Sequence, residues 1–246
     1  MDNQFDPRMT GVNAASVGVP RAARDVGLRS YMLSVYNYMA SGVLLTAIVA
    51  LLFAPYAGQV LISQTGRGLS GIGWIVTLSP LAFVFALSMG VQRMQTSTVK
   101  LLFFAFAAVM GLSMSTLFLA YTGVSIAQTF VAVTAAFMGL SLYGYTTKKD
   151  LSGFGTFLIM GVVGLIVALM INMFLRSPAM QLAISAIGVL LFAGLTAYDT
   201  QKIKSMYFHV AGSDMVAKSA VMGALTLYLD FINMFQFLLS FMGNRR

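Results

Sequence analysis

The chain has 246 residues, of which 59% are hydrophobic and only 9% are charged, and its mean hydropathy is +0.85. Soluble domains carry about 25% charged residues, so these totals exclude a soluble protein and predict one integral membrane domain. The net charge of +8 is first a topology signal in such a protein, and we expect no nucleic-acid partner. With no cysteine and one histidine, the chain has no disulfide, no thiolate chemistry and no His cluster for zinc.

The start of the chain is polar. Residues 1–30 contain four arginines and no apolar run long enough for the core of a signal peptide. We predict a disordered, basic cytoplasmic tail over residues 1–30, a membrane domain over residues 31–242 and a short basic end over residues 243–246.

Seven apolar segments follow, each long enough to cross a bilayer as a helix, which takes about 20 residues. They cover residues 31–54, 74–91, 99–121, 124–145, 153–175, 179–199 and 220–242. The predicted fold class is therefore all-α integral membrane with seven transmembrane helices. Most connections are short, and the longest internal polar loop is expected at residues 200–218.

The basic residues orient these spans. Counted on alternate sides, eleven Lys and Arg lie on the side of the amino terminus and four lie on the other side. The positive-inside rule then predicts a cytoplasmic amino terminus. Arg245 and Arg246 would lie outside, so the last segment either crosses with these charges or re-enters without crossing.

The last apolar segment carries an ionisable residue, Asp230, near its middle. A lone Asp at the centre of a membrane helix costs about 2.5–3.5 kcal/mol on insertion scales, so it should face protein or water. At helical spacing Asp230 falls on one face with Ser219, Gly223, Thr226 and Asn233. This polar stripe predicts that the carboxyl-terminal helix is packed centrally in the bundle, with Thr226 and Asn233 as a supporting polar face.

A second carboxylate, Asp199, ends the preceding span. Kinks or a deep cytoplasmic cavity would bring it to Asp230, and two carboxylates that meet in a low dielectric favour sharing a proton. Two simpler interpretations remain open. Asp199 can pair with Lys202 one turn later at the membrane surface, and Asp230 can be a hydrogen-bonding group between helices worth about 0.6–2 kcal/mol.

Paired membrane aspartates also occur in intramembrane aspartyl proteases. That chemistry requires a glycine-flanked aspartate, whereas Leu227, Tyr228 and Leu229 precede Asp230. No Walker loop, dinucleotide fingerprint, nucleophile elbow or zinc-helix motif is present in the sequence. We therefore expect no enzyme activity, no catalytic residue, no cofactor and no bound metal.

Three stretches resemble one family. They are LYGYTTKKDLS at residues 142–152, GLTAYDTQ at residues 194–201 and ALTLYLDFIN at residues 224–233. With them, nearly all of residues 28–246 is similar to the Bax inhibitor-1 family, also called the transmembrane Bax inhibitor motif family, in its bacterial inner-membrane branch. The resemblance implies seven helices around a central last helix, and a proton-linked aspartate pair that falls on Asp199 and Asp230.

The resemblance also implies a function. An arginine at the end of helix two latches to the helix-six aspartate in family members that conduct ions, and the matching residue is Arg93, which is otherwise an orientation anchor. The implied activity is a pH-sensitive Ca²⁺ leak, with the bilayer, Ca²⁺ and protons as partners. Span two departs from this pattern because it has no acidic residue. The alternative is a non-transporting regulator that binds a membrane-bound quality-control protease.

Overall fold

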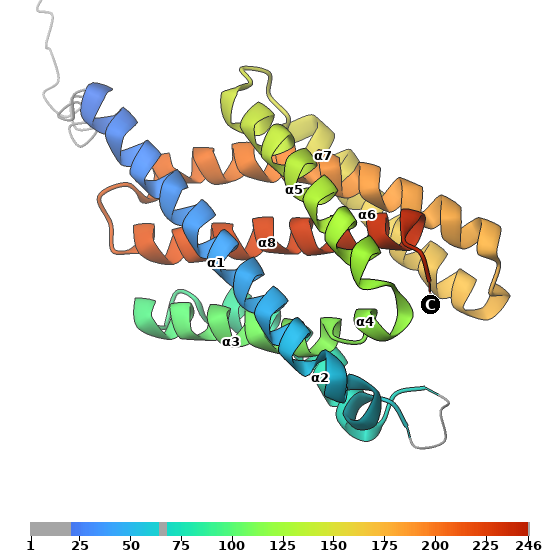
Figure 1. Ribbon diagram of the computed structural model, residues 1–246. Helices are drawn as coiled ribbons and strands as arrows, with labels where there is room; N and C mark the ends of the chain where they lie inside the picture. Colours follow the sequence, from blue (N-terminus) through green and yellow to red (C-terminus); the bar gives the residue numbers. More distant parts are fainter. Residues whose placement is uncertain (1–20, 64–67, 246) are drawn as a thin grey trace, which may run out of the picture.

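The computed structural model describes residues 21–63 and 68–245, with side chains from Asp25 onward. These residues form helices joined by short turns (Figure 1). The helices are α1 (Arg21–Leu61), α2 (Gly71–Gly90), α3 (Thr96–Met114), α4 (Leu117–Ala120), α5 (Gly123–Thr146), α6 (Ser152–Leu175), α7 (Pro178–Val210) and α8 (Met215–Met242). The described residues contain seven candidate spans, because the short α4 continues the span of α3. The prediction of an all-α protein with seven membrane-spanning helices is confirmed.

Two boundaries differ from the prediction. Helix α1 already begins at Arg21 and continues through Pro55 to Leu61, so the predicted tail is helical from residue 21 onward. The rest of that tail, residues 1–20, lies outside the described residues. A proline removes one helical hydrogen bond, but in a membrane span neighbouring helices compensate for the loss and the helix can continue.

The predicted loop at residues 200–218 is mostly helix. Helix α7 extends to Val210 and α8 begins at Met215, so only residues 211–214 connect them. Ile203 is buried in this extension, whereas Lys202, Ser205 and His209 are exposed. The prediction took the polar residues for a loop, but they form the solvent face of an amphipathic continuation of α7.

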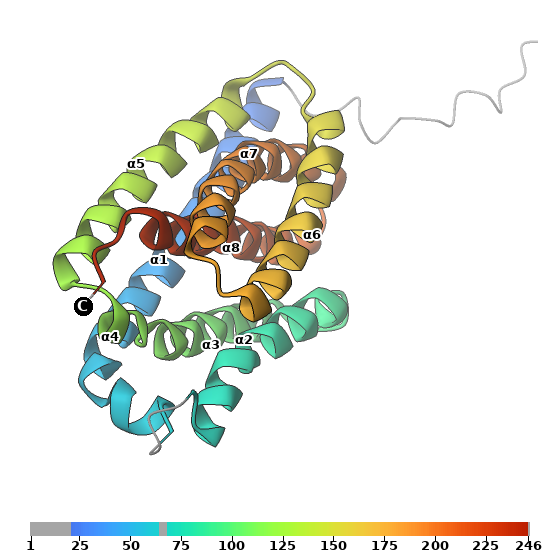
Figure 2. The ribbon, with the colours of Figure 1, turned by 90° about the vertical axis from the view of Figure 1, so that its right-hand side faces the viewer.

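Helix α8 packs against α7, α1, α5 and α3. Its apolar window is 61% buried, compared with 17–39% for the other six spans, so α8 is the most buried of the candidate spans in the described residues. Helix α6 lies beside α7, and α2 lies beside α3 (Figure 2).

Helix α8 also runs the full length of the bundle. Its 28 residues extend about 42 Å at 1.5 Å per residue. Just beyond its end, the Asn244 carbonyl accepts a hydrogen bond from the Thr122 amide, and the Asn244 amide donates to Ser125 Oγ, both at the start of α5. The last segment therefore runs as one continuous helix from the α7–α8 turn to the α4–α5 turn and is long enough to cross a bilayer.

Candidate functional site

Helices α7 and α8 are antiparallel neighbours that bring the two aspartates together. Ser219 donates to the sulfur of Met206 near one end of the interface, and Ser185 donates to Ser240 near the other. Between these contacts the carboxyls of Asp199 and Asp230 face each other within reach of a hydrogen bond. No kink or cavity is needed, because the extension of α7 to Val210 places Asp199 well inside the helix pair.

Both carboxyls are buried, with 8% of Asp199 and 4% of Asp230 exposed. Asp230 Oδ2 is buried and has no hydrogen-bond donor among the described residues. Lys202 acts on Asp199 only at longer range, and its ammonium lies 5.9 Å from the centre of the Tyr198 ring. Asp199 therefore faces Asp230 rather than forming an ion pair with Lys202 at the membrane surface.

This geometry limits what the pair can do chemically. Two carboxyls form a hydrogen bond only when one of them carries a proton, because an ionised carboxylate is an acceptor only. Ca²⁺ takes 6–8 oxygen ligands, and no cluster of three or more His, Cys, Asp or Glu that could hold a metal occurs in the described part of the chain.

The neighbouring α5 is fixed against α7 by close packing and hydroxyl groups. A Cβ on Gly144 would collide with the carbonyl oxygen of Ala197, so glycine permits the close approach of the two helices. The Thr200 hydroxyl donates its proton to the Thr196 carbonyl, so it can only accept from Ser141, whose hydroxyl lies 3.0 Å away. Ser141 in turn accepts from the Tyr36 hydroxyl at 2.6 Å. A chain of hydroxyls thus joins α1, α5 and α7 beside Asp199.

Two of the three family-like stretches, residues 142–152 and 194–201, meet through one glutamine. The Gln201 side chain accepts from the Leu151 amide at 2.9 Å and donates to the Lys149 carbonyl at 2.8 Å, which ties α7 to the α5–α6 turn. Sequence reasoning missed this role of Gln201, and it missed the hydroxyl chain of Tyr36 and Ser141. The available signal was polar side chains inside or next to apolar spans, which need partners in the bundle.

The other predicted site residues lie apart from the pair. Thr226 donates to the Met222 carbonyl and Asn233 donates to the Leu229 carbonyl, so both half-buried side chains bond to their own helix. Arg93 is exposed in the turn after α2 and forms no ion pair with Asp199 in the described residues. The latch by Arg93 and the supporting role of Thr226 and Asn233 remain predictions.

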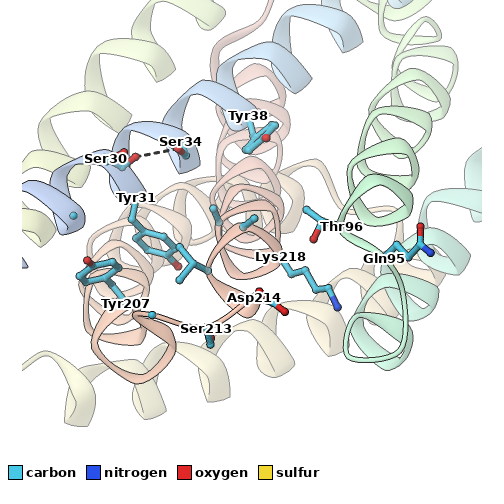
Figure 3. Close-up of a pocket in the computed structure, with 15 residues that line it drawn as sticks. Ser30, Tyr31, Ser34, Tyr38, Gln95, Thr96, Tyr207, Ser213, Asp214 and Lys218 are labelled. Carbon is cyan, nitrogen blue, oxygen red and sulfur yellow. Dashed lines mark hydrogen bonds between the residues drawn. The ribbon is translucent and has the colours of Figure 1, made fainter. Parts of the chain in front are cut away.

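A polar cavity of about 870 Å³ lies at the end of the bundle where α7 turns into α8 (Figure 3). Asp214 and Lys218 line it, and Tyr31, which donates to Ser219 at 2.9 Å, lies at its inner side. We call this cavity the vestibule. Buried residues of α8, among them Val221 and Leu227, lie between the vestibule and Asp230, so apolar side chains separate the two sites along α8.

Residues 28–246 match the sequence profile of the family described as inhibitor of apoptosis-promoting Bax1. The chain belongs to the Bax inhibitor-1 family. Protein RP147 of Rickettsia prowazekii is 47% identical to this family member over 224 residues, which cover 90% of this chain and 92% of RP147. The inner membrane protein YbhL of Escherichia coli is 45% identical over 233 residues, 94% of this chain and 97% of YbhL. With its seven candidate spans, this family member is a multi-pass inner-membrane protein.

Proposed function

We propose that this protein is a pH-sensitive Ca²⁺ leak in which Asp199 and Asp230 hold one proton between them. The observation that supports this most directly is the buried contact of the two carboxyls, together with the Asp230 oxygen that has no donor in the described residues. A carboxylate pair is expensive to bury in a membrane span, and such groups most often mark ion or proton pathways.

The pair changes its charge by one when it takes up or releases a proton. A change of one charge in a low-dielectric bundle must be balanced by a nearby cation or by rearrangement of the helices. In the proposed mechanism Arg93 supplies that cation in the closed form, and Ca²⁺ passes the carboxylates in the open form. The amino terminus is cytoplasmic in this proposal, and the vestibule, which lies at the same end of the bundle, is the cytoplasmic entrance.

Ca²⁺ entry into liposomes that contain the purified protein tests the proposal. We expect wild-type flux to vary with pH between about pH 6 and about pH 8, because two carboxyls that share a proton titrate as one unit. Replacing both aspartates, Asp199→Asn with Asp230→Asn, should abolish this pH dependence. The matched control is Asp150→Asn, which removes one exposed carboxylate from the α5–α6 turn, outside the vestibule lining, and should leave the pH profile unchanged.

Two results would overturn the proposal. One is a pH dependence in the double variant equal to that of wild type, which would remove the pair from the sensor. The other is the absence of flux at every pH from correctly folded wild-type protein. That outcome would favour a non-transporting regulator of a membrane-bound protease, with the aspartates serving as contacts between α7 and α8.

A further inference from the structure

An apolar groove runs between α1 and α5, with Phe231 of α8 among its lining residues. Both helices pack on α8, and they pass in front of it in Figure 1. The groove has a volume of about 810 Å³, and a smaller apolar cavity of about 330 Å³ shares four lining residues with it, Val43, Ala47, Phe130 and Phe231. We propose that this groove binds an anionic phospholipid, with an acyl chain along α1 and α5 and the phosphate beside Arg29.

The rims of the groove point to the bilayer as the source of the occupant. Leu33 and Leu44 of α1, and Met138 and Leu142 of α5, line the groove and are more than half exposed. In a membrane-spanning bundle such side chains face hydrocarbon, so the groove is open to lipid chains. The part of α1 that lines the groove, from Arg29 to Ala47, is about 27 Å long. The hydrocarbon of one leaflet is roughly 15 Å thick, so the groove is long enough for an acyl chain and its headgroup.

The charge at one end of the groove selects the headgroup. Arg29 is the charged residue of the lining; it is exposed and forms no ion pair with another described residue. Behind the lining residue Tyr145, Lys204 donates to the Tyr145 carbonyl at 2.7 Å and lies 4.9 Å from the centre of its ring. Asp25 lies one turn before Arg29 and is not part of the lining. One cation in the lining, a second behind it and no carboxylate in the lining favour a phosphate.

At the Arg29 end of the groove, hydroxyl groups connect the groove to the interior of the bundle. Tyr36 and Ser141 both line the groove, and their hydroxyls form the chain that ends at Thr200, next to Asp199. The bound lipid would therefore touch groups that hold α7 beside the aspartate pair. Lipid binding itself does not depend on the leak activity and is measured separately from it.

Native mass spectrometry of the detergent-solubilised full chain can count bound lipids. We expect phosphatidylglycerol to remain bound in preference to phosphatidylcholine with the same acyl chains. Arg29→Gln should reduce the retention of phosphatidylglycerol about fivefold, the factor expected for one basic residue next to an anionic headgroup. The control is Lys148→Gln, which removes an exposed cation at the same end outside the groove lining and should leave retention unchanged.

A second pair of variants tests the apolar part. Ala40→Phe fills the groove and should reduce retention of both lipids, whereas Ser41→Phe places the same ring on the neighbouring exposed position outside the lining. Equal retention of the two lipids by wild type, or full retention of phosphatidylglycerol by both Arg29→Gln and Ala40→Phe, would overturn the proposal. Displacement of the lipid by inorganic phosphate alone would also do so, because it would indicate an anion site without an acyl-chain groove.

Discussion

The α7–α8 interface has a second, partly buried polar cluster, and it contrasts with the aspartate pair. Asn172 of α6 donates to Gln181 at 3.0 Å, Gln181 donates to Ser240 at 3.2 Å, and Ser185 also donates to Ser240. The Asn172 oxygen accepts from the amide of Ser177. We call these side chains the amide cluster, and it joins the ends of α6, α7 and α8 at the carboxyl end of α8.

The two clusters differ in how completely their polar atoms are partnered. In the amide cluster, neutral donors and acceptors are matched, so it can hold the helices together without any change in protonation. In the aspartate pair, both groups are acceptors when ionised, and one buried oxygen has no donor in the described residues. A matched neutral cluster suits a structural role, whereas a pair that needs a proton to be matched suits the pH sensor proposed above.

The largest stability effect is expected in the amide cluster. Gln181→Leu removes two hydrogen bonds at once and leaves the Asn172 and Ser240 side chains without that partner. Interhelical hydrogen bonds in membranes average about 0.6 kcal/mol, and unsatisfied groups add to the loss, so we expect about 1–2 kcal/mol lower stability. Thermal unfolding in detergent measures this, with Gln236→Leu at an exposed position of α8 as the matched control. Equal melting temperatures of the two variants would refute a structural role for the amide cluster.

The aspartate pair should behave in the opposite way. Asp230→Asn replaces the proposed shared proton by an amide that donates to Asp199 at every pH, so we expect little loss of stability. The melting temperature of this variant should vary less with pH than that of wild type, because one titrating group of the coupled pair is gone. A wild-type pH dependence of melting that persists in Asp230→Asn would show that groups outside the pair titrate in this range.

For the predicted latch residue Arg93 we expect no effect on stability and a change only in the rate of Ca²⁺ leak. Arg93 is exposed in the structure, so Arg93→Ala should leave the melting temperature unchanged. If Arg93 supplies the cation that closes the pathway, the variant should leak Ca²⁺ faster than wild type. Lys148→Ala removes another exposed cation from the same end of the bundle and controls for surface charge. Unchanged or slower leak in Arg93→Ala would remove the latch from the mechanism.

The spans and the two candidate aspartates could be predicted from the sequence, because the free energies of burying apolar and charged residues in a membrane are large. Twenty apolar residues are needed to cross hydrocarbon, and a charged residue such as Asp230 inside such a run requires a special environment. Asp199 was harder to place. The polar residues after it suggested a loop, but the helix continues and buries Ile203 on one side. The polar residues therefore led to a wrong prediction of the helix end. With the helix ending too early, a kink or a cavity seemed necessary to bring Asp199 to Asp230, whereas straight antiparallel packing is sufficient.

Contacts between distant segments could not be predicted from one sequence. Tyr36 reaches Ser141 from a helix more than one hundred residues away, and Gln181 reaches both Asn172 and Ser240. Each of these side chains has a short-range alternative, such as its own helix backbone, which Thr226 and Asn233 in fact use. The register of α7 against α8 decides between these alternatives, and that register depends on packing along the whole interface.

The smallest effect concerns Asp150, an exposed carboxylate that already has a donor. Ser152 donates its amide to Asp150 Oδ1 at 2.9 Å at the start of α6, and this hydrogen bond lowers the pKa of Asp150. The contact therefore contributes stability above the ordinary Asp pKa of about 3.9 and loses it as pH falls through the lower folded value. Asp150→Ala should give a small decrease in melting temperature that is constant from about pH 6 to about pH 8, because Asp150 stays ionised throughout that range. A decrease that changed within this range would mean that surface carboxylates contribute to the pH response, which would weaken the contrast between the aspartate pair and the rest of the molecule.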